Sequence, residues 1–350
     1  MEEFRFFVSG TAPDLFPTHL FFGLLWVGEN DAMQLPRRYP FRGEWGEPIS
    51  THLLERETFP APYMLDMVWL SLTERRFYSV YERLPQEEVK ALLSETDDQT
   101  GEPRYSHLVV GMAPYGGVAV WAHGPQKCTL VRWFRGEPVR VAIEEFLPAN
   151  PSVRLEDYCA EALGAVPEAV ENLQQCGLPP KDLYEKYMQQ FQYRYQIRFG
   201  KWNKKEDSWT EYTEDEAVPE LDSLEELLYD GTHDKLNDGR LLTFHEAGKP
   251  WKLAVRWHIR KGEYFACFWF VDEEIRAAFE RFYGTHPETK SDLLVRIDPE
   301  RNRYQVSLFR PGLPEPLVLP ETAYELLVFR NKFESFRSDN YSQGTDAWLW

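Results

Sequence analysis

One sequence pattern occurs twice in the chain. Pro62–Trp69 and Pro250–Trp257 share a frame of proline, leucine three residues later and tryptophan seven residues later. In both places an aromatic pair follows, and after it an acidic stretch of the kind that starts helices. Two similar stretches of one chain are expected to fold in the same way, so we predict two similar structural units.

Periodicity around the two frames predicts the elements of these units. Alternating apolar residues predict strands, and stretches with apolar residues at helical spacing predict helices. The predicted helices are 85–94, 155–163, 167–175, 181–192, 221–229, 272–283 and 321–336, and residues 140–145 are predicted as a strand. The predicted class is therefore α+β: two pseudo-repeated units of antiparallel sheet plus helix, joined by a helical connector.

The same pattern predicts the domain boundaries. Residues 1–150 form the first repeat unit, and residues 151–192 form the helical connector. Residues 193–350 form the second repeat unit, which contains an acidic insert at 206–238. At 350 residues the chain is long enough for two or three domains with sizeable cores.

The composition is that of an aromatic-rich, acidic globular protein. Hydrophobic residues make up 43% and aromatic residues 15% of the chain, which argues against disorder. The formal net charge is −18, so non-specific binding to nucleic acid or to an anionic membrane surface is not expected. A basic protein is the natural electrostatic partner, although acidity can also serve solubility alone.

The sequence favours a cytoplasmic protein without a metal or another cofactor. Its four cysteines are widely spaced, with no C-x-x-C pair, as free thiols in a reducing compartment would be. The first residues lack the features of a signal peptide, and no run of about 20 apolar residues occurs. Phosphate-binding glycine loops, nucleophile elbows and zinc-protease motifs are absent from the sequence, so we predict that the protein is not an enzyme.

Four tryptophans lie in predicted strand interiors, namely Trp69, Trp121, Trp257 and Trp269. We interpret them as core residues between sheet and helix, because large aromatic side chains carry much of the apolar area that a core buries. A platform for carbohydrate is the alternative interpretation.

The strongest anomaly of composition is the stretch 206–238. It contains thirteen acidic residues and a single base, Lys235, so it carries −12 of the net charge of −18. It is interpreted either as a solvated, partly flexible insert or as an electronegative face for a basic protein, with Tyr212, Leu224 and Tyr229 as possible apolar anchors. The predicted partner-binding residues are Glu206, Asp207, Glu211, Tyr212, Glu214, Asp215, Glu216, Glu220, Asp222, Glu225, Glu226, Tyr229 and Asp230.

Two segments carry a resemblance to a known family. Trp69–Tyr78 follows the pattern W-x-S-L-x-E-x-x-F-Y, and Val110–Trp121 reads Val-Gly-Met-Ala-Pro-Tyr-Gly-Gly-Val-Ala-Val-Trp, similar to the pattern G-x-A-P-G-G-x-V-x-V-W. Over residues 1–150 the chain resembles the bacterial family of unknown function 2931, with Tyr115 where that family is expected to have a glycine. These motifs are structural, and no catalytic residue can be transferred through them.

The resemblance implies a function in bacterial antagonism. Members of the family tend to sit beside secreted antibacterial effectors, which implies that they are cognate immunity proteins. For this acidic chain it implies a toxin that acts in the cytoplasm, such as a type VI secretion effector, with a nuclease as the favoured activity. Two alternatives stay open: an enzyme acting on a small molecule or glycan in a groove between the repeats, and a chaperone or scaffold for effectors.

Overall fold

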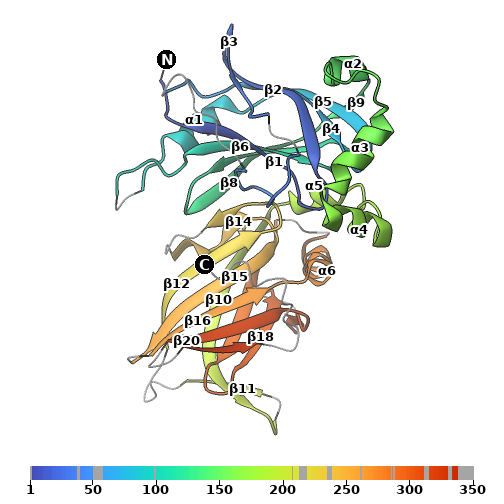
Figure 1. Cartoon of the computed structure of the whole chain (residues 1–350). Coiled ribbons are helices and arrows are strands. Elements are labelled where there is room, and N and C mark those ends of the chain that lie inside the picture. Colours follow the sequence, from blue (N-terminus) through green and yellow to red (C-terminus); the bar gives the residue numbers. More distant parts are fainter. Residues whose placement is uncertain are drawn as a thin grey trace. The chain divides into compact units, whose positions relative to one another are not determined.

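The chain divides into two compact units. The computed structural model describes residues 2–37, 40–49, 58–97, 100–206, 208–212, 219–234, 239–260, 262–284, 286, 288–310, 315–329 and 333–337. The first unit comprises Met1–Met188 and Asp230–Thr232, and the second comprises Gln189–Tyr229 and His233–Trp350 (Figure 1). Each unit has its own buried core, so each is described by itself.

The first unit is built from two sheets. One sheet has the strand order β1-β6-β7-β8, and the other has the order β3-β2-β4-β5-β9. The pairing of β1 with β6 is parallel, and the remaining pairings are antiparallel. The strands are β1 (Phe7–Thr11), β2 (Thr18–Gly28), β3 (Asp31–Gln34), β4 (Met64–Ser71), β5 (Arg76–Arg83), β6 (His107–Ala113), β7 (Gly117–His123), β8 (Lys127–Arg135) and β9 (Glu137–Val139).

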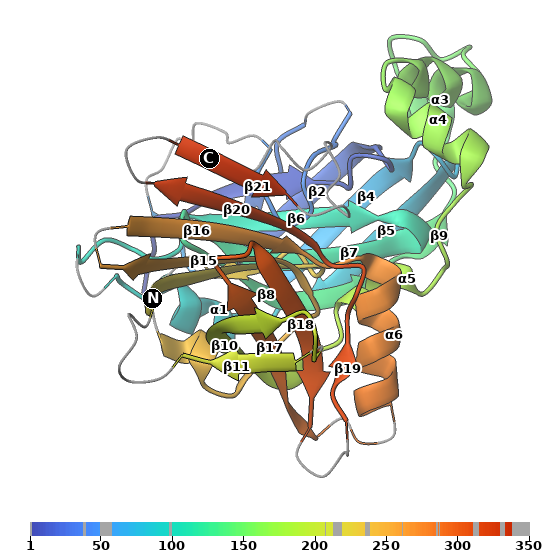
Figure 2. The ribbon, with the colours of Figure 1, turned by 90° about the horizontal axis from the view of Figure 1, so that it is seen from below.

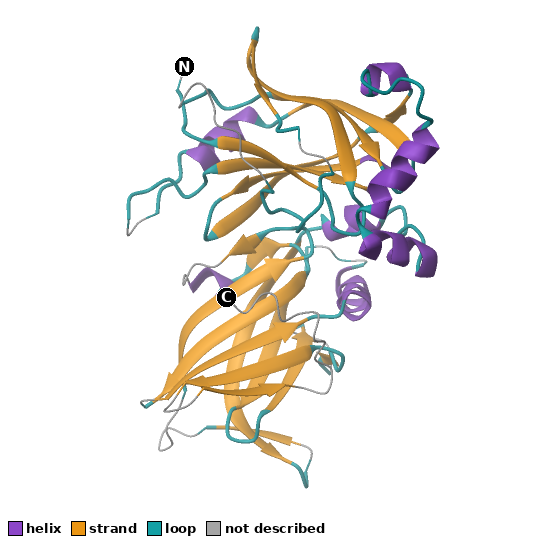
Figure 3. Ribbon diagram, in the orientation of Figure 1, coloured by secondary structure: helices purple, strands orange, loops and turns teal. Residues whose placement is uncertain are grey.

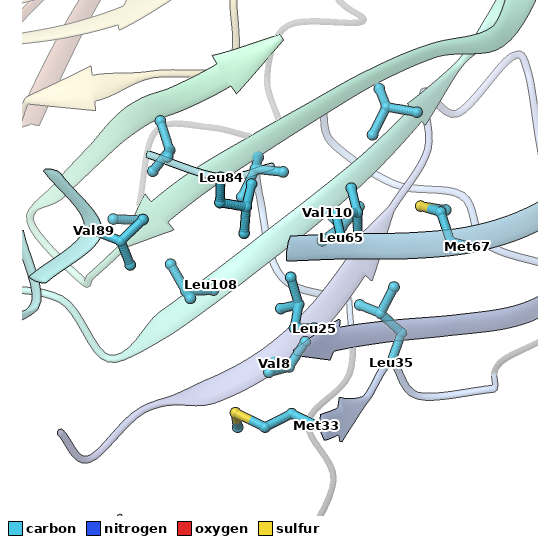
Figure 4. Close-up of a cluster of buried hydrophobic side chains, with 14 of the residues drawn as sticks. Val8, Leu25, Met33, Leu35, Leu65, Met67, Leu84, Val89, Leu108 and Val110 are labelled. Carbon is cyan, nitrogen blue, oxygen red and sulfur yellow. The ribbon is translucent and has the colours of Figure 1, made fainter. Parts of the chain in front are cut away.

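The core of the first unit lies between these two sheets. Side chains alternate along a strand, so every second residue of β4 points inward, and Leu65, Met67 and Trp69 are fully buried. Leu108 and Val110 of β6 face them from the other sheet (Figure 4). Helix α1 (Gln86–Leu93) completes this core with the buried side chains of Val89 and Leu93.

Short helices cover part of the outer surface of the second sheet. These are α2 (Ile143–Phe146), α3 (Leu155–Gly164) and α4 (Pro167–Gln175), which lie together on one side of the unit (Figure 3). They form an apolar cluster with Leu70 and Phe77 of the sheet. Helix α5 (Leu183–Tyr187) also belongs to the first unit.

The second unit also contains two sheets and one long helix. One sheet has the order β11-β10-β17-β18-β19, with β14 also paired to β10, and the other has the order β13-β12-β15-β16-β20-β21 (Figure 2). Helix α6 (Asp272–Tyr283) places Ile275, Phe279 and Tyr283 in the core between them. The strands are β10 (Phe191–Asn203), β11 (Ser208–Glu211), β12 (Glu220–Leu228), β13 (His233–Asp234), β14 (His245–Ala247), β15 (Pro250–Ile259), β16 (Gly262–Trp269), β17 (Lys290–Asp298), β18 (Arg303–Phe309), β19 (Leu317–Val318), β20 (Ala323–Phe329) and β21 (Phe333–Arg337).

The predicted α+β class is wrong. Of the described residues, 48% lie in β-strands and 18% in helices, and they form several sheets rather than units of one sheet plus a helix. The sheets are not purely antiparallel, since β1 pairs with β6 and β10 with β17 in parallel. The helices α3 and α4 predicted as a connector instead pack on a sheet of the first unit, because their apolar faces need a surface to cover.

Some single elements were also predicted wrongly. Residues 221–229 lie in strand β12 and its turn, and residues 321–336 contain β20 and β21. Residues 140–145 contain the start of helix α2 instead of a strand. Leucines at 221, 224 and 228 fit helical spacing, but pairing with β15 decides the conformation. The predicted helices 85–94, 155–163, 167–175 and 272–283 are confirmed as α1, α3, α4 and α6.

The two sequence frames occupy equivalent hairpins. The first frame leads into β4, which pairs with β5, and the second frame forms most of β15, which pairs with β16. In each hairpin the frame tryptophan is fully buried and stacks on the tyrosine opposite, Trp69 on Tyr78 at 5.7 Å and Trp257 on Tyr264 at 5.5 Å between ring centroids. The shared frame therefore builds the same local packing twice.

The turns of the first unit place strict demands on glycine. Gly116 lies in the turn between β6 and β7 with φ +78°, and a Cβ there would lie 2.5 Å from the Gly136 carbonyl oxygen. Gly101 has a similar φ of +72°, but a Cβ there would meet nothing within 4 Å. An alanine at Gly101 would therefore meet only the cost of the left-handed backbone, whereas an alanine at Gly116 would also meet a steric clash.

We predict that Gly116→Ala destabilises the protein much more than Gly101→Ala. A left-handed backbone costs a residue with a Cβ about 1–2 kcal/mol, which is the expected effect at Gly101. The clash adds an overpacking cost, so the loss at Gly116 should reach at least about 3 kcal/mol. Urea denaturation followed by tryptophan fluorescence measures both. Equal losses for the two variants would contradict the packing of this turn.

Candidate functional site: the acidic segment of the second unit

The described residues of the acidic segment lie largely in strands, which belong to two different sheets of the second unit. Glu206 lies in the turn that follows β10, and Glu211 ends β11. Strand β12 carries four further carboxylates, those of Glu220, Asp222, Glu225 and Glu226. The predicted residues Asp207, Glu214, Asp215 and Glu216 lie outside the described residues.

Strand β12 divides its carboxylates between surface and interior. The Glu220 side chain is 77% exposed, and Asp222 and Glu225 are partly exposed, whereas the whole residue Glu226 is only 4% exposed. β12 pairs with β15 along almost its full length, with register shifts near Ser223 and Leu228. The backbone that carries its exposed carboxylates is therefore fixed by the hydrogen bonds between β12 and β15.

One histidine stands among the exposed carboxylates. His258 of β15 lies opposite Glu220, and its Nδ1 is 2.8 Å from Asp222 Oδ1, while its Nε2 is 3.5 Å from Glu220 Oε2. The hydrogen bond with Asp222 is the main influence that raises the pKa of His258, and the charges of Asp222, Glu220 and Glu263 add to it. Protonated His258 neutralises only part of the charge here, so the surface stays acidic.

Glu226 belongs to a buried polar network. Its Oε2 accepts a hydrogen bond of 2.9 Å from the Tyr195 hydroxyl and a longer one of 3.5 Å from Tyr193. Its Oε1 lies 3.6 Å from Nε2 of His245. These residues come from β10, β12 and β14, so the network links three strands. Glu226, one of the predicted partner-binding residues, is enclosed by this network.

The network shifts the pKa values of its members. Burial by itself lowers the pKa of His245, but the hydrogen bond and charge of Glu226 outweigh it, so the pKa is raised above 6.5. Burial and the neighbouring Glu226 raise the pKa of Tyr195 well above its ordinary value. Contact with the Glu226 carboxylate therefore favours the protonated form of His245 over the neutral form.

Other predicted binding residues also have structural contacts. Asp230, which belongs to the first unit, is fully buried, and its carboxylate accepts hydrogen bonds from the Thr232 backbone and hydroxyl. The Tyr229 hydroxyl donates to the Phe270 carbonyl at 2.7 Å. Tyr212 packs under the Lys201 ammonium, 5.3 Å from the ring centroid. Leu224, considered as an apolar anchor, lies in the core.

A pocket beside the hairpin of β10 and β11 was not predicted from the sequence. It has a volume of about 360 Å³, and Trp202 of β10 and Trp209 of β11, with ring centroids 5.4 Å apart, line it. These tryptophans lie opposite each other in the β10–β11 pairing. The signal in the sequence was two tryptophans seven residues apart across a lysine-rich turn. The lining residues are Trp202, Trp209, Arg303, Tyr304, Gln305, Val306, Val318, Leu319 and Pro320.

The chemistry of this pocket suits binding. Its nine described lining residues include no carboxylate, histidine, serine or cysteine, the groups that most often act as bases or nucleophiles. Arg303 and Gln305 supply the charged and amide groups of the lining, and the Gln305 amide oxygen accepts from Arg296 at 2.8 Å. Aromatic walls with a few polar groups are typical of binding sites for ligands or protein side chains.

The four tryptophans of the predicted strand interiors are core residues, as the sequence predicted. Trp69, Trp121 and Trp257 are fully buried, and Trp269 is almost so. Their rings are therefore enclosed in protein and do not form a platform for carbohydrate.

The fold and the exposed carboxylates together define the class of protein. It is a protein of two units, rich in β-strands, with exposed carboxylates on strands of the second unit. Among the described residues no helix is long and apolar enough to cross a membrane. A family model described as "Protein of unknown function (DUF2931)" matches residues 2–176, and the chain belongs to this family. Searches of curated proteins and of solved structures found no match.

We predict that Glu226→Gln destabilises the protein by about 2–3 kcal/mol, because the change removes a buried carboxylate that accepts from two tyrosine hydroxyls and lies 3.6 Å from His245. Glu220→Gln, in the same strand but exposed, should change the free energy of unfolding by less than about 0.5 kcal/mol. Urea denaturation of both variants tests this. A small loss at Glu226 would show that the network contributes little.

Protonation of His245 should stabilise the protein at lower pH. A folded pKa above the ordinary value of 6.5 gives stability that is complete below that value and is lost as pH rises through the folded pKa. The free energy of unfolding should therefore fall as the pH rises above 6.5 and passes through the folded pKa of His245. His245→Gln should flatten this dependence. An unchanged slope in His245→Gln would contradict the assignment.

Proposed function

We propose that the protein binds and neutralises a cognate antibacterial toxin that acts in the cytoplasm. The toxin is of the type VI effector class, with a nuclease as the favoured activity, and it is bound through the acidic surface of the second unit. The observation that carries the proposal is the concentration of charge in residues 206–238, where thirteen acids stand against one base. Its described carboxylates on β12 belong to a hydrogen-bonded sheet.

The physical role of this surface is electrostatic selection. A protein that binds nucleic acid needs a basic cleft, and an acidic surface complements such a cleft. Complementary charge speeds encounter and disfavours wrong partners, while its effect on affinity is smaller. The described members are Glu206, Glu211, Glu220, Asp222 and Glu225, which are exposed or partly exposed.

Apolar anchors for the same partner are proposed on the adjoining hairpin. Trp202 and Trp209 line the pocket, and Glu206 and Glu211 lie on the same β10–β11 hairpin. Tryptophans are over-represented among residues that dominate binding energy, because they bury a large area when a partner covers them. Charge and anchors on one hairpin support a protein partner.

The pocket itself supports a second candidate function. A volume of about 360 Å³ with aromatic walls, Arg303 and Gln305 also fits a small molecule or a glycan. Because the described lining holds no carboxylate, histidine, serine or cysteine, we propose this candidate as binding without catalysis. An effector chaperone is a third candidate, and binding of several unrelated effectors instead of one would distinguish it.

Neutralisation of the acidic surface should slow the association with the toxin. The test uses the protein encoded beside this gene and the variant Glu206→Gln, Glu211→Gln, Glu220→Gln, Asp222→Asn and Glu225→Gln. We expect the association rate at low salt to fall by at least about tenfold and its salt dependence to weaken. Stopped-flow or surface plasmon resonance measures both.

A matched variant controls for net charge. It neutralises five exposed acids of the first unit, Glu88, Glu102, Glu137, Glu145 and Glu156, and so changes the total charge by the same amount. Its association rate should stay within about threefold of the unmodified protein. Equal slowing by both variants would refute a localised surface, and no complex at all would refute the proposed function.

A further inference from the structure

The sheet β3-β2-β4-β5 of the first unit has one face in the core and one face outside. Leu25, Leu65, Met67 and Val80 point inward and are buried in the core between the sheets. Their neighbours along each strand therefore point to the outer face. Helices α2, α3 and α4 cover one end of this outer face, where Leu70 and Phe77 lie.

The other end of the outer face carries aromatic and apolar side chains in rows. The strand registers place Leu24, Asp66 and Tyr81 next to one another across β2, β4 and β5, and Trp26 beside Met64 in the next row. None of these five residues belongs to a buried cluster of the described chain, and Tyr81 is 69% exposed. We name Leu24, Trp26, Met64, Asp66 and Tyr81 the Asp66 face.

Asp66 is the central residue of this face. Its carboxylate stands between Leu24 and Tyr81 in its row, with Trp26 and Met64 in the next. Burial raises the pKa of Asp66, and the Trp26 indole N–H lowers it as a weaker influence. A carboxylate in such surroundings lacks part of its hydration, so a positive group placed against it would be favoured.

We propose that the Asp66 face is a docking surface on which a partner protein places an arginine side chain against Asp66, between Trp26 and Tyr81. A guanidinium pairs with a carboxylate through two parallel hydrogen bonds and stacks on aromatic rings, which an ammonium does less well. Tyrosine, tryptophan and methionine are enriched in protein interfaces, and charged residues are depleted at their centres. A single central carboxylate among such side chains fits one arginine.

The charges around the face define the partner further. The chain has a net charge of −18, which favours a basic partner at longer range. Arg83, in the row of Trp26 and Met64, is exposed and brings one positive charge to the edge of the face. Arg83 would repel a uniformly basic surface, so a partner with a single arginine placed against Asp66 is favoured.

This surface is separate from the acidic segment of the second unit. The family match covers residues 2–176, which include the whole Asp66 face and exclude residues 206–238. All residues that the family model matches belong to the first unit, so a binding surface formed by them lies in that unit. The inference stands on the register and composition of one sheet face and does not require that the partner is a toxin.

The experiment titrates the intact protein with acetyl-arginine amide and, separately, with the neutral isostere acetyl-citrulline amide. Saturation-transfer NMR observes the small molecule and suits weak binding. We expect saturable binding of the arginine probe with a dissociation constant on the order of 1 mM. Asp66→Asn should weaken it by at least about tenfold and Tyr81→Ala by at least about threefold, and the citrulline probe should not bind.

Controls separate this inference from charge in general and from the proposed function. Glu137→Gln removes one exposed carboxylate from the neighbouring strand β9 and should bind the arginine probe like the unmodified protein. Thermal melting establishes that Asp66→Asn and Tyr81→Ala remain folded. Equal binding by Asp66→Asn and the unmodified protein, or no binding by the unmodified protein, overturns the inference. The variant with five neutralised acids in the second unit should retain this site, so failure of the proposed function would leave the result intact.

Discussion

The stacking of a buried tryptophan on the tyrosine of the next strand is the contact on which both units depend. Trp69 and Trp257 each lie between two sheets and contact Tyr78 and Tyr264 across one strand pair. So large a side chain sets the separation of the layers, and its neighbours must adapt to it. A Cβ on Gly136, for example, would lie 2.6 Å from the Trp69 ring. The strands and helices around each tryptophan follow from filling the remaining space at the density of a protein interior.

The acidic segment shows how one strand divides its carboxylates between stability and surface charge. Glu226 points inward, and the tyrosine hydroxyls and His245 compensate its burial. Glu220 instead remains exposed on the same strand. The register shift near Ser223 changes which residues of β12 face the core. A charge count along the sequence therefore overstates what a partner can contact.

The described residues proposed for binding lie on strands, apart from Glu206 in the turn after β10. The β10–β11 hairpin and β12 carry the acidic residues, and β2, β4 and β5 carry the Asp66 face. Backbone pairing fixes the spacing of side chains on such surfaces, which reduces the entropy lost when a partner binds. The matched family region contains the second surface but not the first. The acidic segment thus lies outside the part of the chain that the family model matches.

The sequence by itself determined the buried tryptophans, the helices α1, α3, α4 and α6, and the equivalence of the two frames, because these follow from local periodicity and residue size. The tertiary structure decided the rest. Leucines of β12 that fit a helix became part of a strand because β15 pairs with them, and the predicted class failed for the same reason. Which carboxylates are buried, and that Leu24, Asp66 and Tyr81 share one row, depend on strand register. Register arises from contacts between residues far apart in the chain, and local sequence does not encode it.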